Sequence, residues 1–374
     1  MHRSRRLKVV QLCSISAVLI LICISAGLVG YRGSPRYPSH LVAVIHHKAD
    51  KTKVHKPKNT PESASIAPTV TAAATHSLGS AVLTTPAWTK LSLYTDPNNE
   101  ATTYYQSNPT ADGAALIERE GEVPVSEWFG DWDPDVQSAA NSYVSAASQA
   151  NAVPVLVAYN IPVRDCGSYS AGGAANESAY LDWVRDLAAG IGNRMAVVIL
   201  EPDALPLLDC LSPADQQSRY DALSQAVTIL KADPQLTLYL DAGSSAWQPV
   251  TTMAQRLLAA NIAQADGFSL NVSHFASTSQ NQAYGDQLSK LVGNKHYVID
   301  TSRNGNGNVA PTDWCNPSDA ALGSAPTANT GDPLNDSWLW VKIPWESDGS
   351  CNGAPAAGMV YWSYAIQMAE NANW

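Results

Sequence analysis

Hydrophobic residues along this chain gather in short runs rich in β-branched and aromatic side chains. Seven such runs follow residue 90, at 91–94, 153–159, 195–200, 236–240, 266–271, 296–300 and 337–342. Between most of them lie stretches with helical periodicity, of which 176–192 and 213–232 are the clearest. Strands that alternate with helices indicate a parallel sheet. The pattern predicts an α/β fold, a distorted (β/α) barrel of about seven parallel strands, similar to a TIM barrel.

An open doubly wound sheet would show the same alternation of strands and helices. Many such sheets bind nucleotides through the glycine-rich fingerprints G-x-G-x-x-G or G-x-x-x-x-G-K-[ST]. Neither fingerprint occurs in the sequence. The closed barrel is therefore favoured over the open sheet.

The first 85 residues do not share this pattern. The basic segment MHRSRRLK precedes an uncharged, mostly apolar segment at residues 9–30, which is typical of a secretory signal peptide or of an uncleaved membrane anchor. Residues 31–85 are rich in Pro, Ser, Thr, Ala and Lys, so we expect a disordered linker there. The expected organisation is a signal peptide or anchor at 1–30, a linker at 31–85 and one folded domain at 86–374. That domain is expected to be secreted, or held on the outer face of the cytoplasmic membrane.

Charge divides the chain in the same place. Residues 1–60 hold 11 of the 23 Lys and Arg but one of the 33 acids, which leaves 12 basic and 32 acidic residues in the rest, a net charge of −20. So acidic a domain is a poor partner for nucleic acid and suits a neutral or cationic substrate.

The folded domain has four cysteines, Cys166, Cys210, Cys315 and Cys351. An even number in an exported domain indicates two disulfides. Of the three pairings, Cys166–Cys210 and Cys315–Cys351 are favoured because each closes a fairly short loop. A metal site is the alternative, but no C-x-x-C spacing supports it.

Nearly every predicted strand is followed by polar residues. The carboxyl ends of the strands of a parallel barrel share one face, where active sites form, so we expect one cleft lined by Asp165, Asp203, Asp241, Asn271, Asp300 and Asp348. Glu201, two residues before Asp203, is expected to anchor its strand end by ion pairing. A purely structural role for Asp203 is the alternative, because perturbed acids also occur in structural networks.

Such a cleft fits two kinds of hydrolysis. Metal-assisted hydrolysis usually needs histidines, and the folded part has few. Glycoside cleavage needs one protonated acid and one carboxylate that activates water or attacks carbon. The chain has 11 Trp and 15 Tyr but 3 Phe, and flat rings with a polar edge suit sugar stacking. Trp247 and Trp314 follow turn-like segments and are expected in the cleft, whereas Trp183, Trp338 and Trp340 are expected in the core.

Six motifs, in order along the chain, resemble those of glycoside hydrolase family 6, and most closely its actinobacterial secreted endoglucanases. They are YNIPVRDCGSYSAGG, ILEPDALPLLDC, YLDAGSSAW, IDTSRNGNG, DWCNPSDAALG and NTGDPLNDSWLWVKIPWESDG. The resemblance covers about residues 90–370. It implies a distorted barrel of about seven strands, inverting hydrolysis of β-1,4-glucan, no metal and no cofactor, and it agrees with the favoured disulfides.

The resemblance also implies roles for individual residues. Asp203 of the E-P-D motif matches the general acid. Asp165 of the R-D-C motif matches an auxiliary aspartate that raises the pKa of the proton donor. Asp348 matches the proposed base, which acts through water, and Asp241 matches the D-A-G aspartate. The residues expected to bind substrate are Tyr159, Arg164, Trp247, Asn271, Trp314, Lys342 and Glu346.

Two positions depart from the family pattern. Ser244 stands where the family usually has histidine, and His274 where it often has asparagine, and both are expected near the substrate. The short segment PWESDGSCNGAPAAG indicates an open cleft and internal cutting. A cellobiohydrolase, or a surface-tethered glucan-binding protein with impaired catalysis, is the alternative. We expect a monomer whose partner is a β-glucan, with a membrane tether through residues 9–30 if that segment is not cleaved.

Overall fold

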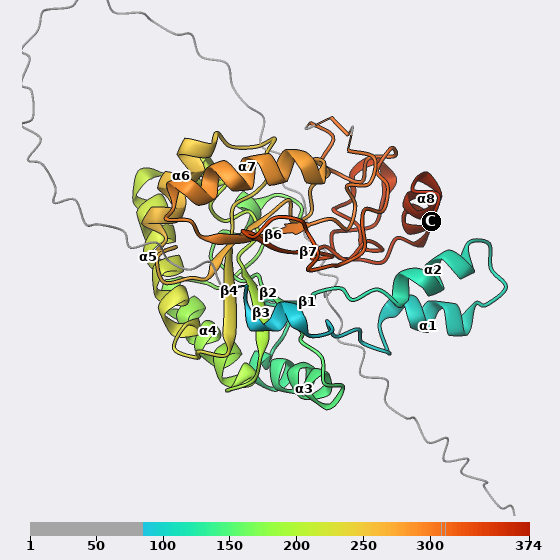
Figure 1. Cartoon of the computed structure of the whole chain (residues 1–374), viewed down its shortest axis with the longest axis horizontal. Coiled ribbons are helices and arrows are strands. Elements are labelled where there is room, and N and C mark those ends of the chain that lie inside the picture. Colours follow the sequence, from blue (N-terminus) through green and yellow to red (C-terminus); the bar gives the residue numbers. More distant parts are fainter. Residues whose placement is uncertain (1–84, 308, 311) are drawn as a thin grey trace, which may run out of the picture. The chain divides into compact units, whose positions relative to one another are not determined.

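The computed structural model describes residues 85–374, except 308 and 311 (Figure 1). The expected signal peptide or anchor and all but the last residue of the expected linker lie outside the described residues. Within the described residues, no helix is both long enough and apolar enough to cross a membrane.

Seven parallel strands form one curled sheet in which each strand pairs with the next along the chain. They are β1 (Glu127–Phe129), β2 (Val155–Ala158), β3 (Ala196–Leu200), β4 (Leu236–Asp241), β5 (Gly267–Leu270), β6 (His296–Asp300) and β7 (Asn335–Leu339). The two ends of the sheet meet through single contacts: the Ser126 amide donates to the carbonyl of Trp340 (3.1 Å) and the Trp128 indole to that of Val341 (2.9 Å). The distorted parallel barrel predicted from the sequence is confirmed.

Helices cover the outer face of the sheet in Figure 1, and they follow the strands in sequence. They are α3 (Val136–Gln149), α4 (Glu177–Ile191), α5 (Pro213–Leu230), α6 (Val250–Ala259) and α7 (Thr278–Leu291). Side chains cap four of them at the N-terminus; Ser277, for example, forms a capping box with Gln280 before α7. The predicted helices at 176–192 and 213–232 are confirmed as α4 and α5.

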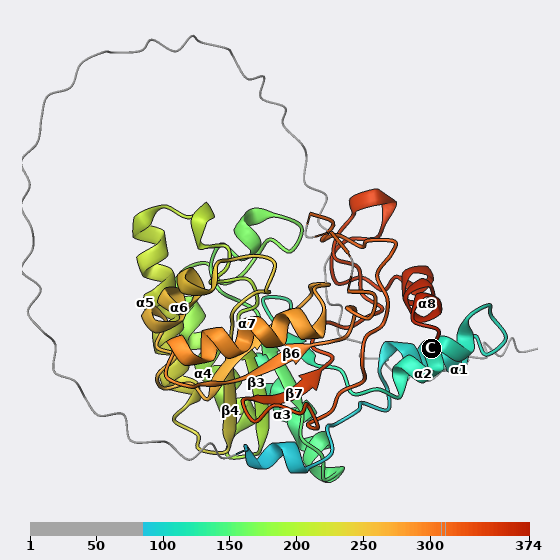
Figure 2. The same cartoon turned by 45° about the horizontal axis from the view of Figure 1, so that its top comes forward.

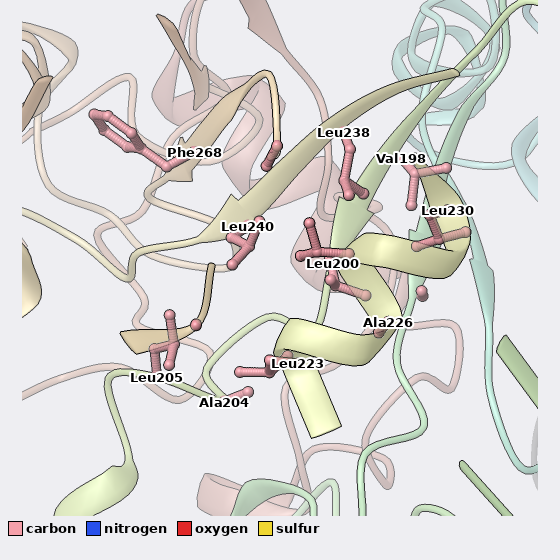
Figure 3. Close-up of a cluster of buried hydrophobic side chains, with 14 of the residues drawn as sticks. Val198, Leu200, Ala204, Leu205, Leu223, Ala226, Leu230, Leu238, Leu240 and Phe268 are labelled. Atoms are coloured by element: carbon pink, nitrogen blue, oxygen red, sulfur yellow. The ribbon is translucent and has the colours of Figure 1, made fainter. Parts of the chain in front are cut away.

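The main core lies between the sheet and these helices. Figure 3 shows Val198 and Leu200 of β3 and Leu238 and Leu240 of β4 next to Leu223, Ala226 and Leu230 of α5. These side chains are at most 3% exposed. Alternate residues of the strands point to the other face: Val197, Ile199 and Tyr239 belong to a second cluster that fills the barrel. Both faces of the strands are therefore buried, which is why they read as nearly continuous apolar runs.

The first strand was predicted in the wrong place. Residues 91–94 contribute a single bridge, Leu93 with Val153, and Leu91 is 48% exposed. The first strand is β1, three residues long, in a segment with no extended apolar run. Its position is set by pairing with β2, which the local sequence does not reveal.

Two disulfides tie the loops at the carboxyl end of the barrel. Cys166 pairs with Cys210, 44 residues away, and Cys315 with Cys351, 36 residues away. This is the pairing favoured by loop length. Each bridge is expected to stabilise the fold by ~2–4 kcal/mol by limiting the unfolded chain.

Three more helices form a separate group: α1 (Glu100–Ser107), α2 (Ala114–Gly121) and α8 (Trp362–Asn371). Glu120 of α2 is completely buried, and neither of its carboxylate oxygens has a hydrogen-bond partner among the described residues. Burial raises the pKa of Glu120 from 4.5 to about 8. The carboxyl group is therefore held neutral in the folded protein near pH 7.

This buried acid predicts a pH-dependent stability. Because the folded pKa of Glu120 lies above the unfolded value, its neutral form stabilises the fold fully below about pH 4.5, and this contribution is lost as pH rises towards about 8. Glu120→Gln has nearly the same shape and cannot ionise. We expect the variant to gain stability over the parent protein as pH rises, by about 1–4 kcal/mol at pH 8. Denaturant unfolding at pH 5 and pH 8 measures this, and an equal difference at both pH values would contradict it.

Candidate active site

A cavity of about 750 Å³ lies at the carboxyl ends of the strands. In Figure 2, the loops that follow the strands gather at this carboxyl end of the sheet. Aromatic side chains form much of its wall: Trp128, Trp132, Tyr159, Trp247 and Trp314. Three of the predicted acids, Asp165, Asp203 and Asp348, also line it.

Behind the cavity, buried carboxylates at strand ends accept backbone N–H groups from neighbouring loops. Glu201 directly follows β3. Its carboxylate accepts hydrogen bonds of 3.0–3.1 Å from the backbone amides of Asn160 and Ile161, two residues that follow β2. The expected anchoring role is thus carried by backbone hydrogen bonds rather than by an ion pair. Burial raises the pKa of Glu201 to about 7, although these bonds oppose the shift.

Asp241 makes the equivalent contacts at the end of β4. Its Oδ2 accepts from the amides of Asp203 and Gly243, each at 3.0 Å, and its Oδ1 from the hydroxyl of Ser269 at 3.2 Å. Burial, and next the charge of Asp203, raise the pKa of Asp241 to about 7. Asp241 is 1% exposed and lies outside the cavity wall. It therefore fixes the backbone of Asp203.

Asp300 at the end of β6 repeats the arrangement on the other side of the barrel. Its two oxygens accept from the amides of Ser273, Ser302, Val341 and Lys342 at 2.9–3.3 Å. It joins the loops that follow β5, β6 and β7. Burial raises the pKa of Asp300, and the hydrogen bonds act in the opposite direction.

Asp165 and Asp203 reach the cavity from sharp turns after β2 and β3. Both have a left-handed backbone, with φ of 52° and 70°, a conformation that costs energy for residues other than glycine. The Oδ2 of Asp165 accepts from the amide of Ser170 at 2.8 Å. Burial raises the pKa of Asp165, the bond from Ser170 lowers it and the charge of Asp203 raises it.

Asp348 lies in the loop after β7 and is held by Arg303. The guanidinium meets both carboxylate oxygens at 2.9 Å, and the amide of Asn316 donates to Oδ2 at 3.0 Å. Arg303 also donates to the carbonyl of Ser273 at 2.7 Å and lies over the ring of Phe275. One buried arginine thus fixes Asp348 against two other loops.

The residues predicted to bind substrate fall into two sets: one set lines the cavity, and the other lies behind the cavity wall. Tyr159, Trp247, Trp314, Lys342 and Glu346 line the cavity. The ammonium group of Lys342 lies 3.3 Å from the Glu346 carboxylate, and both side chains are less than 10% exposed. Trp314 is 43% exposed, so it stands at the rim.

Arg164 and Asn271 lie behind the wall. Arg164 is 1% exposed; it pairs with Asp131 at 2.9 Å and donates to the carbonyl of Tyr159 at 2.7 Å, and its guanidinium covers the Tyr159 ring. Asn271 is fully buried and donates to the carbonyl of Asp300 at 3.0 Å. The structure places both where they position cavity residues.

Sequence analysis missed Trp128 and Trp132 in the wall. They flank the stretch WFGDW at the end of β1, and locating that strand would have pointed to them. Among residues 85–374 as described, no group of three or more His, Cys, Asp or Glu side chains could hold a metal ion.

Known proteins resemble this chain over most of its folded part. The sequence profile described as "Glycosyl hydrolases family 6" matches residues 88–372. Endoglucanase A of Thermobispora bispora is 42% identical over 286 residues, which cover 75% of this chain and 62% of that protein. Endoglucanase 1 of Streptomyces halstedii is 43% identical, covering 69% and 81% respectively.

A solved structure agrees with these relatives. The endoglucanase Cel6 from Mycobacterium tuberculosis, in complex with methyl-cellobiosyl-4-deoxy-4-thio-β-D-cellobioside, superimposes with a TM-score of 0.73 at 43% identity. The match covers 76% of this chain and 98% of that one. By fold, sequence and the order of its strand-end motifs, this chain belongs to glycosyl hydrolase family 6.

Proposed function

We propose that the protein is an endo-acting, inverting hydrolase of β-1,4-glucosidic bonds in cellulose or related β-glucans. The observation that carries the proposal is the set of three carboxylates, Asp165, Asp203 and Asp348, in one aromatic-walled cavity. Glycoside cleavage uses such carboxylates and such walls. The relatives named endoglucanase support the same activity.

Asp203 is proposed as the proton donor. Its carboxyl group borders the cavity, its backbone is fixed by Asp241, and its charge interacts with those of Asp165 and Asp241. The negative charge of Asp203 raises the pKa values of its neighbours Asp165 and Asp241, so repulsion among these acids disfavours ionisation of all of them together. Asp165 is proposed to assist by this repulsion.

Asp348 is proposed as the base that acts through water. Both of its oxygens are held by Arg303, and a covalent bond to carbon would disturb those contacts. Polarising a water molecule does not require the carboxylate to move. This favours inversion over a glycosyl-enzyme intermediate.

The aromatic wall and the Lys342–Glu346 pair are proposed to bind the sugar chain. Rings such as Trp247 and Trp314 offer flat faces to sugar C–H groups. A neutral glucan also suits the acidic folded domain, whose own charge would repel an acidic polysaccharide. The short loop at 344–358 and the exposed rim at Trp314 support internal cutting.

We further propose that residues 86–374 act as a monomeric catalytic domain outside the cell. Residues 1–30 would direct export or remain as a tether, and residues 31–85 would separate that segment from the domain. The relatives' endoglucanase names fit an extracellular polysaccharide as partner.

The substrate is tested by release of reducing sugar. The full chain should release reducing ends from carboxymethylcellulose and from mixed-linkage β-glucan, with a rapid fall in solution viscosity because internal bonds are cut. Release of reducing sugar without that early fall in viscosity would favour a cellobiohydrolase. Binding to glucan without any release would favour the glucan-binding alternative.

The donor is tested by Asp203→Asn. The amide keeps the shape of the side chain but cannot supply the proton, so we expect a loss in kcat of about 10²–10⁴-fold with little change in the affinity for cello-oligosaccharides. Reducing-sugar assays and calorimetric binding measure the two effects. Asp209→Asn, an acid outside the cavity wall, is the matched control. Activity of the Asp203 variant within tenfold of the parent protein would disprove the assignment.

Inversion is tested by the first product formed. An inverting enzyme releases the α-anomer from a β-glucan before mutarotation equalises the anomers. Proton NMR of a cello-oligosaccharide digest in its first minutes should show the α-anomer in excess. An early excess of the β-anomer would mean that Asp348 or a neighbour attacks carbon.

A further inference from the structure

Arg219 lies on the outer helix α5, behind the loops that follow β2 and β3. The residue is 5% exposed, so its guanidinium is buried against these loops rather than held in solvent. Its Nη1 donates to the carbonyl of Ala204 at 3.2 Å. Its Nη2 donates to the carbonyls of Pro162 at 2.8 Å and Val163 at 3.2 Å. A single buried cation therefore joins the loop after β2 to the loop after β3.

These hydrogen bonds lie next to two carboxyl groups of the cavity. Ala204 directly follows Asp203, and Val163 stands two residues before Asp165. The amide of Asp203 donates to Asp241, and the guanidinium holds the carbonyl of the following residue. The backbone of the proposed proton donor is thus fixed from both chain directions.

The backbone at these positions needs such support. Val163 and Asp203 have left-handed φ angles of 55° and 70°, and the left-handed conformation is unfavourable above all for a β-branched residue such as valine. A strained backbone persists only where the surrounding contacts over-determine it. Val163 is 58% exposed, so burial of its side chain contributes little to this restraint. The hydrogen bond from Arg219 to its carbonyl contributes correspondingly more.

Two other contacts tie the same pair of loops. Glu201 binds the backbone amides of residues 160–161, and Cys166 is bonded to Cys210. Glu201 acts at the strand ends, before the cavity acids of both loops in sequence, and the disulfide acts after them. The guanidinium of Arg219 contacts the chain between these two ties. The loops are therefore joined at three successive places, of which the arginine supplies the middle one.

We infer that Arg219 is a positioning residue, which holds the Asp165 and Asp203 loops in the geometry that proton donation needs. The inference rests on the proposed function, in which Asp203 gives a proton to the leaving oxygen. Arg219 itself does not line the cavity. Without its guanidinium, the strained peptides at Val163 and next to Ala204 would relax, and the carboxyl groups would move with them. A displacement of about 1 Å can lower a rate by about 10²-fold.

The first test compares two leaving groups in the full chain carrying Arg219→Lys or Arg219→Gln. Cleavage of cellotetraose requires protonation of the leaving oxygen, whereas dinitrophenolate leaves 2,4-dinitrophenyl β-cellobioside without a proton. We expect kcat for cellotetraose to fall by about 10–10²-fold, and kcat for the aryl substrate by less than about threefold. An equal loss on both substrates, or no loss on cellotetraose, would overturn the inference, because general loosening of the fold affects both reactions alike.

The lysine variant keeps the test decisive if the glutamine variant folds poorly. The charge of Arg219 interacts with that of the buried Glu201, and lysine preserves this charge. Lysine replaces with one nitrogen the two that bind different loops in the parent protein, and it lacks the planar fork of arginine. We expect the same selective loss as in the glutamine variant, but a smaller one.

The matched control is Arg194→Lys, at the amino end of the barrel just before β3. Arg194 is half-buried and donates to the carbonyls of Ile191 at 2.7 Å and Asn141 at 3.3 Å. It therefore also joins two segments through their carbonyls, but far along the chain from the carboxyl ends of the strands. This variant should leave kcat for both substrates in place. A selective loss on cellotetraose here would overturn the inference.

The second test combines Arg219→Lys with Asp203→Asn. With no proton donor left to position, the arginine change should lower the residual cellotetraose rate by no more than about twofold. A further loss as large as that of the single variant would overturn the inference. If Asp203→Asn alone lowers both substrates equally, the proposed function fails, and the inference fails with it. A selective loss for Asp203→Asn but not for the Arg219 variants would refute the inference alone.

Discussion

The active face of this barrel depends on buried carboxylates that accept backbone N–H groups from neighbouring loops. Glu201, Asp241 and Asp300 stand at the ends of three strands and bind loops that follow adjacent strands. A buried carboxylate without such donors would be costly, and the loops would lose the contacts that define their paths. The same bonds satisfy the acids and hold the cavity wall.

This arrangement also brings several acidic side chains close together. Asp241 fixes the backbone of Asp203, and its own raised pKa arises from burial and from the Asp203 charge. Asp165 experiences the same charge from a separate loop. When carboxyl groups lie close together, the negative charge of one disfavours ionisation of the next. The hydrogen bonds that hold the loops and the raised pKa of Asp241 therefore have one structural origin, the burial of this carboxylate beside Asp203.

The opposite wall is organised around a cation. Arg303 joins Asp348 to the carbonyl of Ser273 and to the Phe275 ring. Through the Ser273–His274 loop, this cation also supports the imidazole that faces Asp203. Asp203, the proposed proton donor, and Asp348, the proposed base, thus lie in different electrostatic surroundings. Asp203 lies among acids and Asp348 against an arginine, and such a difference suits a reaction that needs one acid and one base.

The sequence by itself determined the alternation of strands and helices, the carboxyl-end location of the acids and the family. These follow from local patterns: apolar runs of strand length, helical periodicity and motifs within a few residues. It placed the first strand wrongly, since β1 is defined by pairing with β2 rather than by its own residues. Tertiary structure alone decided that Arg164 and Asn271 lie behind the wall while Trp128 and Trp132 lie in it. Burial and the proximity of charges depend on how distant segments pack, and no local pattern encodes that.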